Sequence, residues 1–165
     1  MRSQWIPTEI FEHILAALMP ENRLACEISL ATGLRIGDVL KLRPDQVEPR
    51  LKRFTIKEEK TGKRRTVYLP KELRERAYSQ CGRYWVFEHR LDRDKHRTRQ
   101  AVYKDLRRAA SLFRVKAQVS PHTARKVFAV NYFKKNGCNI KKVQNLLNHS
   151  NEAVTYLYAM ADTIK

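Results

Sequence analysis

The chain has 165 residues, 42% of them hydrophobic, and its 34 lysines and arginines against 17 aspartates and glutamates give a net charge of +17. This length and hydrophobicity suit one folded domain and exclude a disordered segment. No apolar run approaches the roughly 18 residues of a membrane span. The widely spaced cysteines lack a CxxC pair, which argues against a zinc site or a disulfide framework and fits reduced thiols in the cytoplasm. The positive charge favours a polyanionic partner, most often nucleic acid, over a membrane or a merely soluble basic protein.

Helical periodicity characterises the N-terminal part of the chain. Thr8 can cap a first helix. The apolar face of that helix consists of Ile10, Phe11, Ile14, Leu15 and Leu18. Asn22 can cap a second helix, and Gly33 suits its C-terminal end. A short third helix is predicted over 35–43, because the residue before Pro44 is disfavoured in a helical conformation.

The middle of the chain changes to the pattern of β-strands. Residues 53–58 and 65–70 are rich in strand-forming residues, and they flank a turn at 60–63 that contains a glycine. This arrangement predicts an antiparallel β-hairpin. A helix is then predicted over 71–80.

The segments between this helix and the next have weaker patterns. Residues 84–87 fit either a strand or a loop. Residues 89–100 form a charge run, which suits a solvated face as well as a contact with a polyanion. Thr98 can cap the helix that follows. The inward side of that helix consists of Val102, Leu106, Ala109 and Phe113.

The C-terminal part returns to helical periodicity. Ser120 and Pro121 suit the N-cap and first positions of a helix that is predicted to end near Gly137. A shorter helix is predicted over 140–147 and a last one over 151–161. Together these patterns predict an α+β fold, mainly α-helical with a small antiparallel β-sheet, in one domain.

Basic residues at two helix junctions could bind an anion. Arg35 follows the helix stop at Gly33, where its side chain is open to a ligand. His122 and Arg125 are three positions apart and share a helix face. His122 lies in the first turn, where free N–H groups and the helix dipole favour a phosphate and a neutral imidazole. The alternatives are a surface arginine and an ordinary pair of residues on a basic helix.

Two lysines and a later histidine also have alternative roles. Lys60 and Lys63, at the predicted hairpin turn, could serve only solubility and turn formation. One of them could instead swing into a phosphate site and donate a proton. His149 follows the helix predicted over 140–147, where it could be a structural residue or a partner of the C-terminal helix dipole.

Two tyrosines near the C-terminus compete for a chemical role. Tyr156 and Tyr158 are about 200° apart on a helix, so both cannot face one site. The inward stripe of this helix consists of Val154, Leu157 and Ala161. Tyr158 flanks this stripe and Tyr156 points away from it. The pattern therefore directs Tyr158 toward the protein body, where either a site or plain core could receive it.

Taken in chain order, these residues resemble the catalytic signature of the tyrosine recombinases, also called phage integrases. The matching positions are Arg35 in TGLRIGD, Lys60 in KTGK, His122 and Arg125 in HTAR, His149 in LLNH, and a tyrosine. Each motif is weak alone, but the ordered set covers nearly the whole chain and is specific. In this family the tyrosine follows the late histidine by nine residues, which selects Tyr158. The family's lysine precedes the hairpin turn, which selects Lys60 over Lys63.

The resemblance also implies a supporting residue and shows two departures. Asp38 matches the acidic residue often found three positions after the first arginine, and it would orient or support the site. Asn148 replaces the family's usual glycine before the late histidine, and Ala124 replaces the usual leucine before the second arginine. Neither departure removes a functional group.

The fold implied by the resemblance is the tyrosine recombinase catalytic domain. Residues 1–165 would form a single catalytic domain, without the N-terminal helical domain that closes around DNA in family members. The implied partner is double-stranded DNA, bound by a homo-oligomer that is a tetramer on DNA. A cytoplasmic, nucleoid-associated protein encoded by a bacterium, a phage or a mobile element is expected.

The implied reaction is site-specific recombination. The Tyr158 hydroxyl would attack a DNA phosphodiester to give a 3′-phosphotyrosine and a free 5′-hydroxyl, and a second 5′-hydroxyl would reverse the step. The implied roles are general base for His122, general acid for Lys60, phosphate binding for Arg35 and Arg125, and a further hydrogen bond for His149. No metal or cofactor is implied. A type IB topoisomerase and a non-catalytic DNA-binding accessory protein of the same fold remain alternatives.

Overall fold

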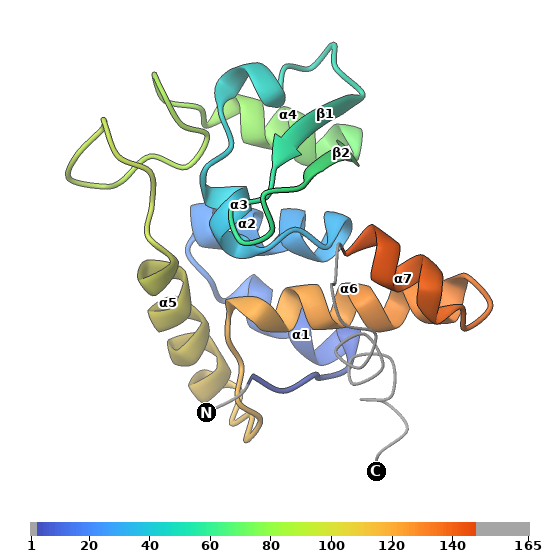
Figure 1. Ribbon diagram of the computed structural model, residues 1–165. Coiled ribbons are helices and arrows are strands. Elements are labelled where there is room, and N and C mark those ends of the chain that lie inside the picture. The colour runs from blue at the N-terminus through green and yellow to red at the C-terminus, as the bar shows by residue number, and fades with distance from the viewer. Residues whose placement is uncertain (1–2, 148–165) are drawn as a thin grey trace.

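The computed structural model describes residues 3–147 (Figure 1). Its elements, in chain order, are α1 (Thr8–Ala16), α2 (Pro20–Thr32), α3 (Ile36–Leu40), the 3-10 helix η1 (Pro44–Gln46), β1 (Arg53–Lys57), β2 (Arg64–Tyr68), α4 (Lys71–Ser79), α5 (Arg99–Leu112), α6 (Pro121–Lys135) and α7 (Ile140–Leu146). This mainly helical architecture with one antiparallel hairpin confirms the predicted α+β class. The helix predicted over 151–161 lies outside the described residues. Within 3–147, no helix combines the length and apolarity needed to cross a membrane.

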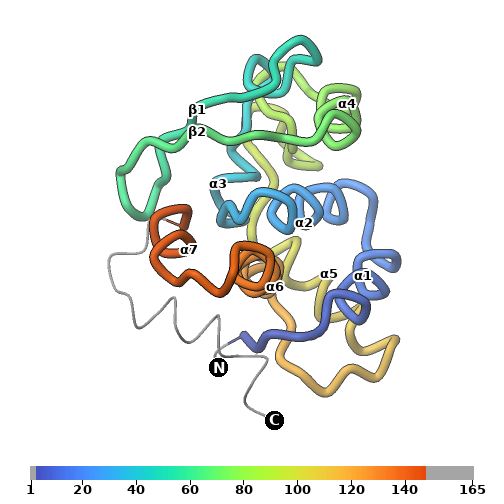
Figure 2. The backbone as a smooth tube through the Cα atoms, turned by 90° about the vertical axis from the view of Figure 1, so that its right-hand side faces the viewer, coloured from blue at the N-terminus to red at the C-terminus, as the bar shows by residue number. Residues whose placement is uncertain are grey.

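Helix α2 lies at the centre of the fold and packs against α1, α3, α4 and α6 (Figures 1 and 2). It can be covered on several sides because Leu24, Ala25, Cys26 and Ile28, all of them buried, point in different directions around the helix. The hydrophobic core around it includes Phe11, Ile14, Val39, Leu40, Leu106 and Val127.

The start of α2 differs from the prediction. Met19 occupies the N-cap position without a side-chain capping bond, and the helix begins at Pro20, whose fixed φ suits the first position. The prediction that Asn22 caps the helix was wrong, because its side-chain amide donates to Asp105 Oδ2 on α5 (2.8 Å). Thr8 makes no capping bond either, since the preceding proline takes the N-cap position of α1.

The predicted starts of the two long C-terminal helices are confirmed. Thr98 Oγ1 accepts a hydrogen bond from the Ala101 N–H at the start of α5 (3.2 Å). Ser120 Oγ accepts one from the His122 N–H at the start of α6 (3.2 Å), and Pro121 occupies the first position of that helix. These local bonds fix where each helix begins, and so which residues lie in its first turn.

The connection between α4 and α5 is a long loop (Figure 1). Residues 84–87 belong to this loop and form no strand, although Val86 and Phe87 are buried. Phe113, predicted on the inward side of α5, was placed wrongly. It lies just past the end of the helix and is 48% exposed.

Strands β1 and β2 pair antiparallel and confirm the predicted hairpin. Side chains alternate along them, so Phe54, Ile56 and Val67 face the core. The same alternation continues past the end of β1 to Glu58, which is fully buried. A carboxylate on the core side of a sheet requires ionic or hydrogen-bonding partners.

Replacing Gly33 with alanine is expected to destabilise the protein by about 2–4 kcal/mol. Gly33 ends α2 with φ of 68°, and an added Cβ would lie 2.4 Å from ring atoms of Phe128. Gly137→Ala is a matched control, because Gly137 has φ of 65° but open space around it. It should cost only about 1 kcal/mol. Urea unfolding measures both variants, and equal losses would contradict the close contact with Phe128.

Candidate functional site

One cavity of about 650 Å³ gathers residues from distant parts of the chain. Its wall is formed by α3, the turn between β1 and β2, and the first turns of α5 and α6. The polar lining includes Arg35, Asp38, Lys60, Arg99, Tyr103 and His122. Three of the predicted catalytic residues and the predicted supporting aspartate therefore open onto a single space.

The end of α2 positions Arg35. Gly33 stops the helix in the left-handed conformation, and Leu34 is buried behind it. Arg35 then takes an extended backbone conformation at the start of α3 (φ −67°, ψ 142°). Its Nη1 donates to Glu58 Oε2 (2.9 Å), and its side chain is 19% exposed. A guanidinium has five N–H donors, so this bond leaves others for a ligand in the cavity.

The hairpin turn carries Lys60 to the cavity. The turn closes where the Glu58 N–H donates to the carbonyl of Lys63 (2.9 Å). Asp38 Oδ1 accepts a hydrogen bond from the Glu59 N–H (3.0 Å), which ties the turn to α3. Lys60 lines the cavity and Lys63 does not. Of the two candidate lysines, Lys60 is therefore the one that shares the cavity with Arg35.

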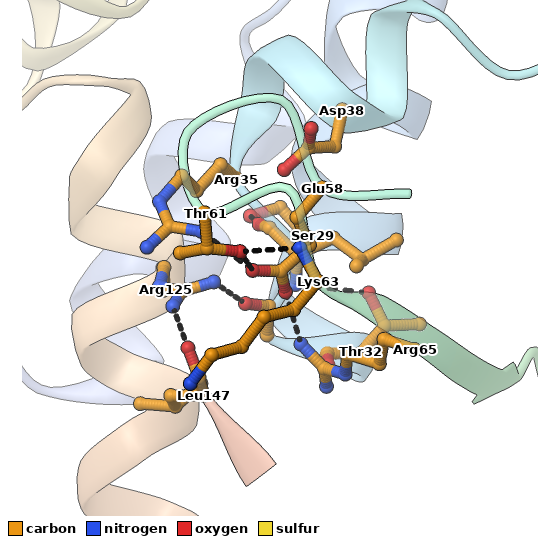
Figure 3. Close-up of polar contacts among 12 residues, drawn as sticks. Ser29, Thr32, Arg35, Asp38, Glu58, Thr61, Lys63, Arg65, Arg125 and Leu147 are labelled. Atoms are coloured by element: carbon orange, nitrogen blue, oxygen red, sulfur yellow. Dashed lines mark hydrogen bonds and ion pairs between the residues drawn. The ribbon is translucent and has the colours of Figure 1, made fainter. Parts of the chain in front are cut away.

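Helix α6 contributes His122 and Arg125 in different ways. His122, in the first turn, lines the cavity. Arg125, one turn further along, is fully buried and donates through Nη1 to the carbonyl of Gly33 (2.6 Å) and through Nη2 to the carbonyl of Leu147 (2.7 Å) (Figure 3). His122 and Arg125 were expected on one face of the helix. The structure places the His122 imidazole at the cavity wall and the Arg125 charge in the protein interior.

A buried carboxylate, that of Glu58, lies among the positive side chains (Figure 3). Its Oε2 accepts hydrogen bonds from Arg35 and from Thr61 Oγ1 (3.0 Å), and its Oε1 lies 3.6 Å from Arg65 Nη1. Burial acts to raise the pKa of Glu58, but the Thr61 hydrogen bond and the charges of Arg35 and Arg125 outweigh it, so this pKa is lowered. The carboxylate is therefore ionised at neutral pH.

Glu58 and Arg65 were not predicted from the sequence to belong to the site. The alternation of side chains along the hairpin indicates that both residues face the core, because Glu58 and Arg65 fall on the same side as Phe54 and Val67. A charged residue on that side needs a partner of opposite charge. The identity of the partner depends on how the hairpin meets the junction of α2 and α3, which no local pattern reports.

The first two turns of α5 also line the cavity, with Arg99, Gln100 and Tyr103. The sequence assigned Arg99 and Gln100 only to the end of a charge run. The cap at Thr98 could have identified them, because it fixes the start of the helix and so places both residues in its first turn. Nothing in the local pattern distinguishes Tyr103 from an ordinary surface tyrosine.

Asp38 contributes a carboxylate at the cavity wall. Burial raises the pKa of Asp38, although the Glu59 N–H opposes this rise by hydrogen bonding to the ionised form. Among the described residues, Asp38 Oδ2 has no hydrogen-bond partner. The ionised carboxylate therefore lowers the stability of the fold at neutral pH.

The remaining predicted residues, His149, Tyr156 and Tyr158, lie outside the described range of 3–147. Their roles stay predictions.

The sequence as a whole matches a known family. The model of the phage integrase family aligns with residues 4–163. This chain belongs to the phage integrase family. Tyrosine recombinase XerD of Lacticaseibacillus casei is 29% identical over 146 residues, covering 83% of this chain and 49% of the relative. Tyrosine recombinase XerA of Thermococcus kodakarensis is 31% identical over 160 residues, covering 91% and 55%. The chain thus spans about half the length of these integrase relatives.

Solved integrases share the fold. A lambda integrase dimer bound to a COC′ core site superposes with a TM-score of 0.81 at 18% identity, covering 100% of this chain and 62% of that one. The catalytic domain of bacteriophage HP1 integrase superposes with a TM-score of 0.68 at 25% identity, covering 97% and 89%. The predicted tyrosine recombinase catalytic-domain fold is confirmed.

Asp38→Asn is expected to raise the free energy of unfolding at pH 7. Asparagine keeps an oxygen for the Glu59 N–H but removes the buried charge. Because the folded-state pKa of Asp38 is raised, wild type loses stability as pH rises from the unfolded value of about 3.9 through the folded value. The gain should therefore be complete above the folded pKa and vanish below about pH 4. Denaturant unfolding at several pH values tests this, with exposed Asp45→Asn as a control expected to change little.

Proposed function

We propose that this chain is the catalytic domain of a site-specific DNA recombinase, which cleaves and rejoins strands through a 3′-phosphotyrosine intermediate. The observation that carries the proposal is the cavity that gathers Arg35, Lys60 and His122 in a member of the phage integrase family. These side chains supply a fixed positive charge, a proton donor and a proton acceptor around one space. The net charge of +17 supports a DNA partner, because Lys and Arg contacts to phosphates dominate DNA affinity.

In the proposed site the scissile phosphate lies beside Arg35. This guanidinium can bind the non-bridging oxygens in a bidentate manner and stabilise the charge of the pentacoordinate transition state. Arg125 adds positive charge from the interior, close enough to influence the carboxylates of Glu58 and Asp38. Because protein cations supply the charge that a metal ion could otherwise supply, metal independence is part of the proposal.

The proposed reaction begins when Tyr158 Oη attacks the phosphorus and passes its proton to His122. The P–O5′ bond breaks as Lys60 protonates the leaving oxygen, which gives a 3′-phosphotyrosine and a 5′-hydroxyl. His149 donates a further hydrogen bond to the phosphate. The 5′-hydroxyl of a second strand then attacks the phosphotyrosine and releases Tyr158. Each step exchanges one phosphoester bond for another, so no ATP is consumed.

The proposed partner is double-stranded DNA, bound by copies of the protein that form a tetramer during strand exchange. The lambda integrase neighbour is a dimer bound to its core site, which supports both DNA binding and self-association. Arg99 and Lys60, both exposed at the cavity, are suited to contact the DNA backbone. Because the chain spans about half of its relatives, the target, the assembly and a cytoplasmic, nucleoid-associated location are proposed for the whole protein.

Tyr158→Phe is expected to abolish a covalent protein–DNA adduct, because the variant has no hydroxyl to attack phosphorus. The measurement uses a nicked suicide duplex that carries the candidate target, low salt and a chelator, followed by denaturing electrophoresis. Tyr156→Phe is the matched control and should form the adduct.

An adduct that survives Tyr158→Phe but is lost in Tyr156→Phe would overturn the assignment of the nucleophile. Loss of the wild-type adduct on chelation would contradict metal independence. No adduct on any target would favour a non-catalytic DNA-binding protein, and rejoining in cis without sequence preference would favour a topoisomerase.

Lys60→Ala is expected to slow cleavage of a normal phosphodiester by about 10²-fold or more, because the 5′-oxygen would leave without a proton. A substrate with sulfur in place of the bridging 5′-oxygen should restore the rate, since a thiolate leaves without protonation. Lys63→Ala is the matched control and should cleave both substrates at nearly the wild-type rate, because Lys63 lies outside the cavity lining. A Lys60→Ala defect of equal size on both substrates would rule out the general-acid role.

A further inference from the structure

We propose that Glu58 is a positioning residue, whose buried carboxylate holds the phosphate-binding Arg35 and the turn that carries Lys60 in one fixed arrangement. Neither the family signature nor the motifs of the sequence include this residue. The inference deepens the proposed function and rests on it for the roles of Arg35 and Lys60.

The first support is the geometry of the carboxylate (Figure 3). Both partners of Glu58 Oε2 belong to the site region, since Arg35 Nη1 donates to it over 2.9 Å and Thr61 Oγ1 over 3.0 Å. Arg65 approaches the other oxygen, Oε1, at 3.6 Å. A second group on Arg65, Nη2, donates to the carbonyl of Thr32 at the end of α2. Glu58 therefore bonds the hairpin to the start of α3 through Arg35, while its neighbour Arg65 bonds the hairpin to the end of α2.

The second support is that the Arg35 side chain contacts a buried carboxylate and also lines the cavity. This side chain is 19% exposed, while the Glu58 side chain that it contacts is 0% exposed. One group of the guanidinium, Nη1, is thus held by a charge-assisted bond in the interior, and the side chain lines the cavity. An arginine held in this way needs little reorganisation when a phosphate binds, which is how preorganised sites stabilise a transition state.

The third support is the position of Glu58 in the hairpin turn. Its backbone N–H donates to the carbonyl of Lys63 (2.9 Å), and its carbonyl accepts from the Gly62 N–H (2.8 Å). Its side chain accepts from Thr61 within the same turn. Lys60 lies between these anchor points. The residue that binds Arg35 therefore also shapes the backbone that presents Lys60.

A purely structural ion pair is the competing explanation, because removing one partner of any buried pair destabilises a protein. The chain offers a control for that explanation in a second carboxylate between two arginines, Glu27, whose side chain is more exposed (17%) than that of Glu58 (0%). Glu27 also joins two arginines, with Arg23 Nε at 2.8 Å and Arg76 Nη2 at 2.6 Å, but it connects α2 with α4 and does not line the cavity. Glu27→Gln should therefore report the effect on cleavage of losing a carboxylate that pairs with two arginines away from the cavity.

The test compares Glu58→Gln, Glu27→Gln and wild type as full chains. Single-turnover cleavage of a nicked suicide duplex is measured at saturating protein, together with DNA affinity. We expect Glu58→Gln to bind DNA within about threefold of wild type but to cleave it about 10–100-fold more slowly, since misplacing a group by about 1 Å costs on this order. Glu27→Gln should cleave at nearly the wild-type rate.

A second substrate separates positioning from general damage. A neutral methylphosphonate with a bridging 5′-sulfur at the scissile position lacks both the charge that Arg35 neutralises and the leaving oxygen that Lys60 protonates. The rate difference between wild type and Glu58→Gln should shrink to a few-fold on this substrate. A defect of equal size on both substrates, or no defect on either, would overturn the inference.

Thr61→Val keeps the protein testable if Glu58→Gln does not fold. This variant preserves the carboxylate and its bond to Arg35 but removes the link to the turn. It should slow cleavage of the normal substrate, and a bridging 5′-sulfur should restore the rate, because the misplaced group is then Lys60. A Thr61→Val protein that cleaves the normal substrate as fast as wild type would contradict the coupling of the turn to the carboxylate.

Failure of the proposed function is recognised separately. If wild type forms no adduct on either substrate, the recombinase proposal fails. Nitrogen NMR of the Arg35 guanidinium still decides the positioning role, because restricted rotation in wild type should be lost in Glu58→Gln and retained in Glu27→Gln. Equal mobility of Arg35 in all three proteins would overturn the inference without any assay of activity.

Discussion

Burial of the Arg125 guanidinium is the constraint on which the arrangement of the site depends. A charge removed from water needs polar partners, and an unmatched one costs several kcal/mol. The carbonyls of Gly33 and Leu147 meet this need because each ends a helix, where carbonyls lack intrahelical partners and the helix dipole is negative. The ends of α2 and α7 are thereby fixed against α6. Arg35 and His122, each within three residues of these contacts, are placed as a consequence.

The carboxylates of Glu58 and Asp38 differ in what they contribute to the site. The contacts of Glu58 lower its pKa, so its charge is favourable to the fold. Burial raises the pKa of Asp38, so its charge is unfavourable, although Asp38 fixes the hairpin turn through the Glu59 N–H. A buried carboxylate with an unfavourable charge beside cationic side chains is typical of sites in which orientation is maintained at the expense of stability.

Local chemistry predicted much of the fold, and tertiary contacts account for what it missed. Ser120 and Thr98 were identified as caps because a cap is a bond between near neighbours. Asn22 was misassigned because its amide bonds to Asp105, 83 positions away, and no window of sequence contains both. The cavity residues that match the family signature were predicted from the order in which the motifs occur along the sequence. Glu58 was missed because strand alternation indicates that it is buried but not which arginine it meets.

The two-stranded sheet has a consequence for the behaviour of the protein in concentrated solution. Within residues 3–147, β1 pairs only with β2, so each strand has an edge without a neighbouring strand. Such edges can pair with another copy of the same protein and begin aggregation. Arg53, Lys57 and Arg64 are exposed along this hairpin, and like charges on two approaching copies repel each other. The basic character that suits a polyanionic partner thus also keeps free molecules apart, and screening by salt should weaken this protection.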